Sequence, residues 1–432
     1  MKTVMVLAVN FPPTGGVGVI RTLKFVKYLP AFGWHPMVVT LPAGTKQIQD
    51  NSLLNEVPED IPVHRPPYFD YRRYFPKPVV KLIQSYEKRV YFPDKYIRWN
   101  NAALKYIEAE IIDKQKIDLV YTSVGPHSTL LLAHEIKKRF NIPIFIDFRD
   151  PFSFSQYALL DTKHSYQEKA QAIETKVFKN ADQINNVSRI WQQAYEFRYP
   201  EIGSKSSLIH NGYDEKDFEH LGQKEPNDIF TVGYNGTFSR IVPLDPLMEA
   251  IRNIHRDHQI AIRLSIATPI KKAKLTSRYP YHFQNNLVDH KGFLPHKMSL
   301  ANLHQSDVSA LILNDIEATQ GMIPAKTFEY LRIHNPILLL HRKGSFLAKI
   351  IEKTKTGLTA NITDQKDIMA TLLALHEKWR LHQLDHKPDW KEIQKYERKH
   401  LTYQLAETFN RLVTKKGIEV SNSSVKQNQV FT

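Results

Sequence analysis

The stretch that decides the fold is Gly321-Met322-Ile323-Pro324-Ala325-Lys326-Thr327-Phe328-Glu329-Tyr330-Leu331, which lies between two apolar runs, Val308–Leu313 and Pro336–His341. Both runs are nearly continuous in aliphatic residues, a pattern typical of parallel strands that are buried on both faces. Pro324 is a favourable first residue for a helix. The stretch therefore predicts a strand–helix–strand unit, the building block of doubly wound α/β sheets.

The same alternation of short apolar runs and helical patterns covers most of the chain. The predicted strands of the first half are 3–9, 36–41, 118–122, 144–148, 183–187 and 208–210. Those of the second half are 230–234, 261–267, 287–292, 308–313, 336–341 and 357–360. Because 432 residues are too many for one ordinary core, we predict two Rossmann-like domains with doubly wound parallel sheets, facing each other across a cleft.

The boundary between the halves falls in a polar stretch, 211–228, which carries Gly212, Gly222 and Pro226. We predict an N-terminal domain at 1–215, with an insertion at about 44–98, and a C-terminal domain at 226–380. A helical region at 381–414 is expected to dock back on the first domain. The polar tail 415–432 is predicted to be disordered.

Composition narrows the classes of function. Cysteine is absent, which excludes disulfides, thiolate nucleophiles and Cys-ligated zinc. No apolar stretch approaches the roughly 20 residues that span a bilayer, so we expect a cytoplasmic protein or one that is peripheral at the inner face of the plasma membrane. The net charge of +15 favours polyanions in general, but no nucleic-acid-binding motif is evident, and no specific nucleic-acid partner is expected.

The segment Arg65–Arg98 interrupts the alternation. It holds nine basic residues, three acidic residues and nine Tyr or Phe. Interleaved cations and aromatics suit a membrane interface or a phosphate-bearing acceptor, and the candidate contacts are Arg72, Arg73, Lys88 and Arg89. The alternative is an inserted helix pair whose aromatics pack inward and whose charges are solvated.

Glycines follow the first strand at Gly15, Gly16 and Gly18. At a strand-to-helix turn such residues let backbone amides approach a ligand, and the next helix presents its N-terminus to negative charge. Arg21 stands where the dinucleotide fingerprint requires a third glycine, and no acidic residue ends the second strand, so NAD binding is disfavoured. A purely structural turn remains an alternative.

Charged residues follow the strand 144–148, at the edge of the sheet where α/β folds bind ligands. Asp150 and, after the preceding strand, His127 are candidate site residues. Asp150 could instead pair with Arg149, and His127 could be a capping or core residue.

The second half supplies the sharper candidates. Arg240 follows the strand 230–234 and could meet a diphosphate. Glu329 lies about one turn after Lys326, so both side chains occupy one helix face. The carboxylate could accept two hydrogen bonds from vicinal ribose hydroxyls, while Lys326 and the helix end hold phosphate. An ordinary Lys–Glu helix pair is the alternative.

Several motifs, in this order and spacing, resemble those of the family 4 glycosyltransferases of the GT-B fold, in a bacterial surface-polysaccharide subgroup. The resemblance covers nearly the whole chain. Its motifs are Phe11-Pro12-Pro13 with Gly15-Gly16, Phe92-Pro93-Asp94 with Trp99, Asp147-Phe148-Arg149-Asp150-Pro151, Asn211-Gly212-Tyr213-Asp214, Gly292-Phe293-Leu294-Pro295-His296, and Pro324 to Leu331.

The resemblance implies a retaining transferase that moves a sugar from a nucleotide-diphosphate sugar to a saccharide or lipid-linked acceptor. It implies no metal and no other cofactor, because helix dipoles and basic residues neutralise the leaving diphosphate. The departing phosphate would act as the base, so Asp150 and His127 would orient acceptor or sugar hydroxyls.

The chain departs from the family pattern at two places. Gly321 occupies the position of the first glutamate of the family pair, and Leu244-Asp245 stands where relatives carry a lysine. These departures put the sugar contacts in question. A sugar-nucleotide epimerase of the same fold and a non-catalytic GT-B scaffold therefore remain alternatives.

Overall fold

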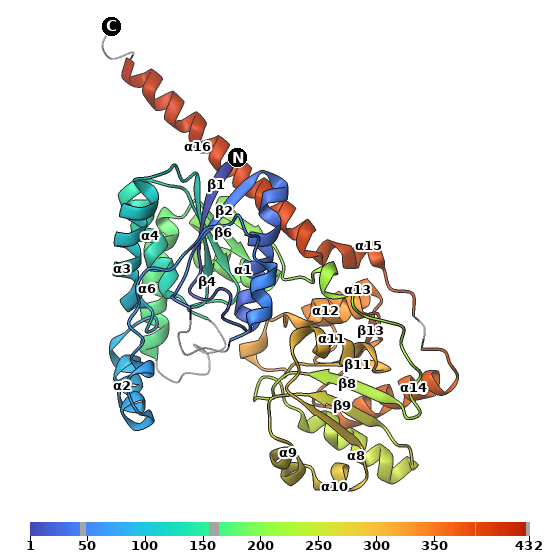
Figure 1. Ribbon diagram of the computed structural model, residues 1–432. Helices are drawn as coiled ribbons and strands as arrows, with labels where there is room; N and C mark the ends of the chain where they lie inside the picture. The colour runs from blue at the N-terminus through green and yellow to red at the C-terminus, as the bar shows by residue number, and fades with distance from the viewer. Residues whose placement is uncertain (44–48, 155–163, 385, 429–432) are drawn as a thin grey trace. The chain divides into compact units, whose positions relative to one another are not determined.

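The computed structural model describes residues 1–432 except 44–48, 155–163, 385 and 429–432 (Figure 1). The chain forms two compact units. Unit 1 comprises residues 1–210 and 398–432, and unit 2 comprises residues 211–397. Residues 211–215 and 381–397 thus belong to unit 2, unlike the sequence-based division. The reason is local packing: Tyr213 and Phe218 share a core with Ile393, and the Tyr213 amide donates to the Tyr396 carbonyl at 3.0 Å.

Unit 1 is built on a seven-stranded parallel sheet of order β3-β2-β1-β4-β5-β6-β7. The strands are β1 (Lys2–Leu7), β2 (Trp34–Val39), β3 (Val63–His64), β4 (Leu119–Val124), β5 (Ile144–Phe148), β6 (Gln183–Asn186) and β7 (Ser206–Leu208). Six of these strands confirm the predicted ones, with ends that differ by one or two residues. The sequence analysis missed β3, a two-residue edge strand that is too short to show a pattern.

Helices cover both faces of this sheet (Figure 1). They are α1 (Val17–Tyr28), α2 (Lys77–Val90), α3 (Ile97–Ile107), α4 (Ser128–Phe140), α6 (His164–Asn180), α7 (Arg189–Arg198) and α16 (Arg398–Asn428). Side chains of β1 alternate between the two faces: Met5 and Leu7 pack under α3 and α4, whereas Val4 and Val6 pack against α1 and α16. This alternation is what a strand buried on both faces requires.

The C-terminal helix α16 completes the core of unit 1. Leu401, Leu405 and Phe409 recur every four residues along it and pack with Trp34 and Phe145. The ring centroids of Phe409 and Trp34 lie 5.2 Å apart. The docking expected for this region is therefore a helix stripe that closes one face of the sheet.

Residues 415–428 differ from the sequence-based prediction of disorder, because α16 continues to Asn428. A polar composition prevents a segment from forming a core of its own, but it does not prevent continuation of a helix whose first turns are already fixed by packing. The last four residues of the predicted tail, 429–432, lie outside the described residues.

Unit 2 has a six-stranded parallel sheet of order β10-β9-β8-β11-β12-β13. The strands are β8 (Thr231–Asn235), β9 (Arg263–Ala267), β10 (Val288–Gly292), β11 (Val308–Ile312), β12 (Ile337–Leu340) and β13 (Gly357–Ala360). All six confirm predicted strands. The helices are α8 (Asp245–His258), α9 (Lys272–Arg278), α10 (Pro280–Gln284), α11 (His296–His304), α12 (Lys326–Ile333), α13 (Phe346–Thr354), α14 (Gln365–Arg380) and α15 (Trp390–Ile393).

Each sheet has one topological switch point. In unit 1 the chain runs from β1 outward to β3 and then returns to β4 on the other side of β1. In unit 2 it runs from β8 outward to β10 and returns to β11 on the other side of β8. Loops that leave two neighbouring strands in opposite directions open a crevice at the carboxyl edge of the sheet, which is where α/β folds bind ligands.

The segment 49–98 follows β2 and ends in the first turn of α3. It contains a 3-10 helix at Asn51–Glu56, strand β3, a 3-10 turn at Tyr71–Arg73 and helix α2. Residues 44–48 of the predicted insertion lie outside the described residues. Among the helices that the structure describes, none combines the length and apolar character needed to cross a membrane.

A buried ion pair and the hydrogen bonds around it tie α1 to β4, β5, β6 and the segment after β7 in unit 1. The Arg21 guanidinium donates to both carboxylate oxygens of Asp147 at 2.7 and 2.9 Å, and also to the carbonyls of Ile209 and His210. Asp147 accepts further bonds from the Tyr121 hydroxyl at 2.5 Å and from Asn185 at 2.8 Å. Burial would raise the pKa of this carboxyl, but Arg21 and the hydrogen bonds outweigh it and lower the pKa.

Replacing Asp147 should therefore destabilise unit 1 strongly. Asp147→Ala leaves the buried Arg21 cation without its counter-charge, and we expect a loss of about 3–5 kcal/mol in the free energy of unfolding. Urea denaturation followed by circular dichroism measures this loss. Asp150→Ala, three residues further along and exposed, is the control, and a similar loss in both variants would contradict the role of the Arg21–Asp147 pair.

Candidate functional site

The site in unit 2 is centred on the ammonium group of Lys326. This residue begins α12, after β11, and its side chain reaches the end of β8 across the switch point. Its Nζ donates to the Asn235 carbonyl at 2.9 Å and to the Tyr234 hydroxyl at 3.3 Å, and it lies 4.3 Å from the centroid of the Tyr234 ring. All of these partners are neutral, so the cation is held in place without being neutralised.

Burial shapes the acid–base behaviour of this lysine. Desolvation lowers the pKa of Lys326 to about 8, while the negative charge of nearby Glu329 acts in the opposite direction. The amine therefore remains mostly protonated at neutral pH and loses its charge under mildly alkaline conditions. A half-desolvated cation of this kind gains strongly from an anionic ligand.

Gly236 leaves the room that the ammonium group occupies. Its φ of +132° is a conformation that side chains rarely adopt, and a Cβ built there would lie 3.1 Å from Lys326 Nζ. The sequence analysis gave this glycine no individual role, because only the fold brings it against Lys326.

Glu329 lies in the first turn of α12, and its Oε1 is 2.8 Å from His296 Nε2. With the carboxylate ionised, Nε2 is the donor in this bond. His296 is the first residue of α11, the helix that follows β10. His296 ends the motif Gly292–His296, but no sequence spacing links positions 296 and 329.

Hydrogen bonds fix the three elements around the Glu329–His296 pair relative to one another. The Asn235 amide donates to the Tyr330 hydroxyl at 3.4 Å, and its side-chain amide donates to the Ser299 carbonyl at 2.7 Å. The end of β8 is thus tied to both α11 and α12. The site therefore rests on packed secondary structure.

Helix α12 begins two residues later than the sequence analysis expected. Pro324 precedes the helix, and its carbonyl accepts the Thr327 amide at 2.9 Å. The Met322 amide is already used by the Thr319 carbonyl at 3.0 Å. Met322 is therefore not among the amides that the helix end could offer a ligand.

The glycine at position 321, where the family pattern has its first glutamate, has a conformational explanation. Gly321 adopts a φ of +76°, in the left-handed region that favours glycine. A glutamate at this position would strain the backbone. The departure from the family pattern is thus built into the loop between β11 and α12.

Arg240 is exposed in the loop after β8. The Asn314 side chain donates to its carbonyl at 2.8 Å, and reciprocal backbone bonds of 3.1 Å between Ser239 and Val242 close the turn around it. The backbone is therefore held, while the guanidinium is on the surface of unit 2. A role in binding diphosphate stays a prediction.

The glycine loop of unit 1 packs around Arg149. The Arg149 guanidinium donates to the carbonyls of Gly18 and Gly125, and to that of Val124 at 3.1 Å. A Cβ at Gly18 or Gly125 would lie 3.0 Å from a guanidinium nitrogen. Gly18 thus has a structural reason to be glycine. The hydrogen bonds of Arg149 go to carbonyls, and the alternative of a pair with Asp150 is present as an electrostatic effect on the Asp150 carboxyl. Gly15 and Gly16 precede α1, and Gly16 needs its φ of +99° to start that helix.

His127 and Asp150 lie at the carboxyl edge of the same sheet. The His127 ring stacks on Phe152, with centroids 4.1 Å apart, and burial lowers its pKa to about 3, so the ring is neutral at physiological pH. Among the described residues, its Nε2 has no hydrogen-bond partner. Asp150 is exposed, yet desolvation by the surrounding protein raises the pKa of its carboxyl to about 6, against the effect of Arg149.

The four basic candidates of the insertion divide into different environments. Arg72 forms an ion pair with Asp70 at 2.6 Å, and its role as an acceptor or membrane contact stays a prediction. Arg73 is exposed and donates to the Ala43 carbonyl at 2.9 Å, and Arg89 is exposed on α2. The side chain of Lys88 lies outside the described part of the structure.

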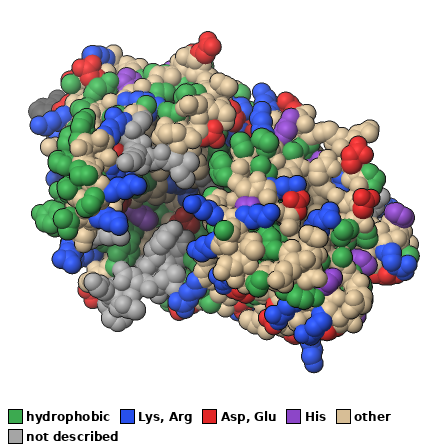
Figure 2. Space-filling model, turned by 60° about the horizontal axis from the view of Figure 1, so that its bottom comes forward, with side chains coloured by type: hydrophobic (Ala, Val, Ile, Leu, Met, Phe, Trp, Pro, Cys, Tyr) green, Lys and Arg blue, Asp and Glu red, His purple; other side chains and the backbone are tan. Residues whose placement is uncertain are grey.

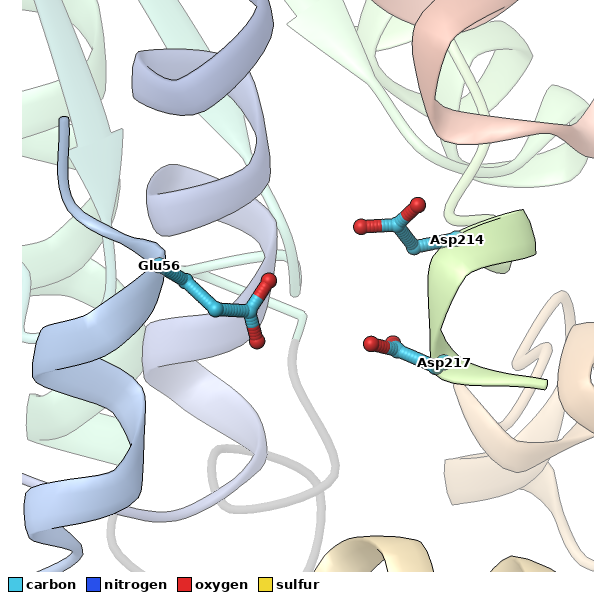
Figure 3. A group of neighbouring side chains, drawn as sticks. All are labelled: Glu56, Asp214 and Asp217. Carbon is cyan, nitrogen blue, oxygen red and sulfur yellow. The ribbon is translucent and has the colours of Figure 1, made fainter. Parts of the chain in front are cut away.

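Figure 3 shows three carboxylates, of Glu56, Asp214 and Asp217. Asp214 and Asp217 extend from the short 3-10 helix of unit 2, where Asp214 caps the Lys216 amide at 3.2 Å. Glu56 belongs to unit 1, where its carboxylate accepts hydrogen bonds from the ammonium groups of Lys24 at 2.6 Å and Lys27 at 2.7 Å. Glu56 and Asp214 are thus accounted for within their own units, and no metal is assigned to the group.

Solved structures share this architecture. Sucrose-phosphate synthase from Thermosynechococcus elongatus superimposes with a TM-score of 0.62 at 14% identity, covering 99% of this chain and 100% of the other. Anabaena HepE, solved with UDP and glucose, gives 0.58 at 14% identity, with 95% and 100% covered. A Listeria monocytogenes protein assigned as a UDP-N-acetylglucosamine 2-epimerase gives 0.56 at 14% identity, with 94% and 95% covered. Comparisons with protein-family models and with curated sequences found no match.

At this level of identity the likeness establishes the fold. The chain has the GT-B architecture, with two parallel-sheet domains of seven and six strands. The fold class predicted from the sequence is confirmed.

The lowered pKa of Lys326 can be measured directly. Reductive ¹³C-methylation should give one lysine NMR signal that titrates near pH 8, and Lys326→Met should remove that signal. Because the folded-state pKa lies below the unfolded value, the unfolded chain binds more protons between about pH 8 and 10.5, so the free energy of unfolding should rise with pH across this window. If Lys326 instead titrates together with most of the other lysines, its pKa is not lowered by burial.

Proposed function

We propose that this protein is a glycosyltransferase that moves a sugar from a nucleotide-diphosphate donor to an acceptor. The observation that carries the proposal is the group Lys326, Glu329 and His296 at the switch point of unit 2, in a chain of GT-B fold. A cation held by neutral partners, with a carboxylate one turn away on the same helix, suits a ligand that carries both phosphate and a vicinal diol.

Each side chain has a distinct part in the proposed binding. The Lys326 ammonium keeps its charge for the diphosphate, because its present partners are a carbonyl, a hydroxyl and a ring. The Glu329 carboxylate accepts hydrogen bonds from the ribose hydroxyls, and exchanges the His296 bond for them or shares it. Arg240 reaches the diphosphate from the loop after β8. The HepE structure, which contains UDP and glucose, supports this class of ligand.

The proposed chemistry follows family 4 and retains the anomeric configuration. The basic side chains and helix ends neutralise the leaving diphosphate, so no metal or other cofactor is required. The departing phosphate takes the proton of the acceptor hydroxyl. His127 is neutral and partly buried, which suits hydrogen bonding to a sugar or acceptor hydroxyl, and Asp150 serves the same orienting purpose. The loop of Gly15, Gly16 and Gly18 approaches the donor.

We propose a saccharide or lipid-linked acceptor and a role in surface-polysaccharide biosynthesis. Such an acceptor places the enzyme in the cytoplasm, at the inner face of the plasma membrane.

The second candidate is a sugar-nucleotide epimerase. The structural likeness to the Listeria protein favours it. An epimerase converts the donor without an acceptor, whereas a transferase does not. Incubating the chain with UDP-sugars alone, and separating the products by chromatography with mass detection, distinguishes the two.

Removing the Glu329 carboxylate tests the proposed donor site. Glu329→Ala should weaken UDP binding by about 1–3 kcal/mol, because charged hydrogen bonds to the ribose are lost. Isothermal titration calorimetry measures the change. Glu317→Ala removes the same charge from an exposed position 12 residues earlier and should leave the affinity unchanged. Equal affinity in the Glu329 variant would remove this residue from the nucleotide site, and a wild-type chain that binds no UDP-, GDP- or CMP-sugar would favour a scaffold.

The affinity for UDP should depend on pH through Lys326. With a pKa of about 8, the amine is mostly charged at pH 7 and mostly neutral at pH 9. If the charged form alone binds diphosphate, the apparent dissociation constant should rise about tenfold between these pH values. Calorimetry at both pH values measures this rise. Lys326→Met should bind weakly at both and show no such rise, and a wild-type affinity that is flat with pH would contradict the contact.

A further inference from the structure

Exposed apolar side chains gather in one short segment of unit 1. Among the described residues, 16 large hydrophobic side chains are exposed, and six of them fall within residues 69–90: Phe69, Tyr74, Phe75, Leu82, Tyr86 and Val90. Single exposed hydrophobics are normal on protein surfaces, but a cluster is not. The proposed transferase chemistry uses none of these six residues.

Three of them form a stripe along α2. Leu82, Tyr86 and Val90 follow one another at intervals of four residues, so they project from one side of the helix. Their relative exposures are 72%, 61% and 50%. The other side of α2 faces the protein: Glu87 is buried and accepts the Tyr71 hydroxyl at 2.5 Å. One side of α2 thus makes a buried polar contact with the protein, and another side exposes an apolar stripe.

The segment before α2 adds an aromatic group. Phe69 and Tyr74 stack on each other with centroids 5.4 Å apart, although both are more than 60% exposed, and Phe75 is 45% exposed. Between them, Tyr71 is buried. The buried Tyr71 therefore anchors this surface to the protein, while the neighbouring aromatic rings stay exposed.

Charges in this segment are sorted by sign. The two acidic residues of the segment, and Asp94 just beyond it, have internal partners: Asp70 binds Arg72 at 2.6 Å, Glu87 lies 3.4 Å from Arg98, and Asp94 caps the Ser128 amide of α4 at 2.9 Å. The exposed charges of the segment include Arg73, Lys77, Lys81 and Arg89. Its outer surface is consequently cationic, beside the apolar stripe.

The surface view agrees with this distribution. On the left side of Figure 2, which belongs to unit 1, hydrophobic and basic side chains are interspersed and acidic ones are few. Figure 1 places α2 at one end of unit 1, beyond α3 and α6.

We propose that the surface formed by residues 69–90 docks on an anionic lipid bilayer, with Leu82, Tyr86, Val90 and the three rings entering the interface. Lys77, Lys81, Arg89 and Arg73 face the lipid phosphates. Amphipathic helices of this kind bind through apolar burial together with attraction to anionic headgroups. The complementary charge favours a lipid surface over a second copy of the same cationic face. This docking goes beyond the proposed transfer reaction and does not depend on it.

Co-sedimentation of the full chain with vesicles tests the docking. Wild type should bind vesicles of phosphatidylcholine with phosphatidylglycerol, should bind phosphatidylcholine alone weakly, and should be released by salt. Lys81→Glu with Arg89→Glu should lower the partition coefficient at least about tenfold, since each cation near the surface contributes to attraction. Lys349→Glu with Lys366→Glu makes the same change of net charge on exposed residues of unit 2 and should have little effect.

The apolar stripe needs its own pair of variants. Leu82→Glu with Tyr86→Glu should abolish binding, whereas Phe197→Glu, at a side chain that is 86% exposed on α7, should not. Because the substituted residues are exposed, melting curves should stay at the wild-type midpoint, and trypsin resistance provides a second check of folding. Binding that ignores salt, lipid charge and both α2 variants would overturn the proposal. So would self-association in sedimentation velocity that the α2 variants abolish without any vesicle binding.

Discussion

The ammonium group of Lys326 is the interaction on which the site in unit 2 depends. It is partly desolvated, and its hydrogen-bond partners within the described chain are the Asn235 carbonyl and the Tyr234 hydroxyl, with the Tyr234 ring beside it. These groups orient the cation without cancelling its charge. The free-energy cost of holding a charge in this way is visible as a pKa lowered to about 8. An anion that binds there offsets that cost.

The rest of the unit serves this arrangement. The switch point brings the end of β8 beside the loop from β11 to α12, so Tyr234 and Lys326, 92 positions apart, come within 3.3 Å. Tyr330 and Ser299 fix Asn235, and His296 holds the Glu329 carboxylate. Gly321 takes a backbone conformation that a glutamate could adopt only with strain. The loop therefore keeps the proposed nucleotide contacts, and under the proposed function the sugar would be bound by groups other than a glutamate at position 321.

Unit 1 carries two features that serve different ends. Arg149 fills the space between the Gly18 and Gly125 loops and donates hydrogen bonds to their carbonyls at the switch point of that sheet. Residues 69–90 instead direct apolar and basic side chains outward, while their acids turn inward. The first feature shapes the carboxyl edge of the sheet, and the second forms the surface for which membrane docking is proposed.

The sequence by itself determined the elements. Short apolar runs that alternate with helical patterns predicted twelve of the thirteen strands in the described part of the chain. The runs at 308–313 and 336–341 are nearly continuous, as strands buried on both faces require, and the spacing of Lys326 and Glu329 placed both on one helix face. It did not determine strand order, the start of α12 or the partners of buried charges. Those depend on contacts between distant positions, such as Glu329 with His296 and Arg21 with Asp147. Local pattern records which face of an element is buried, whereas only the packed tertiary structure decides what lies against it.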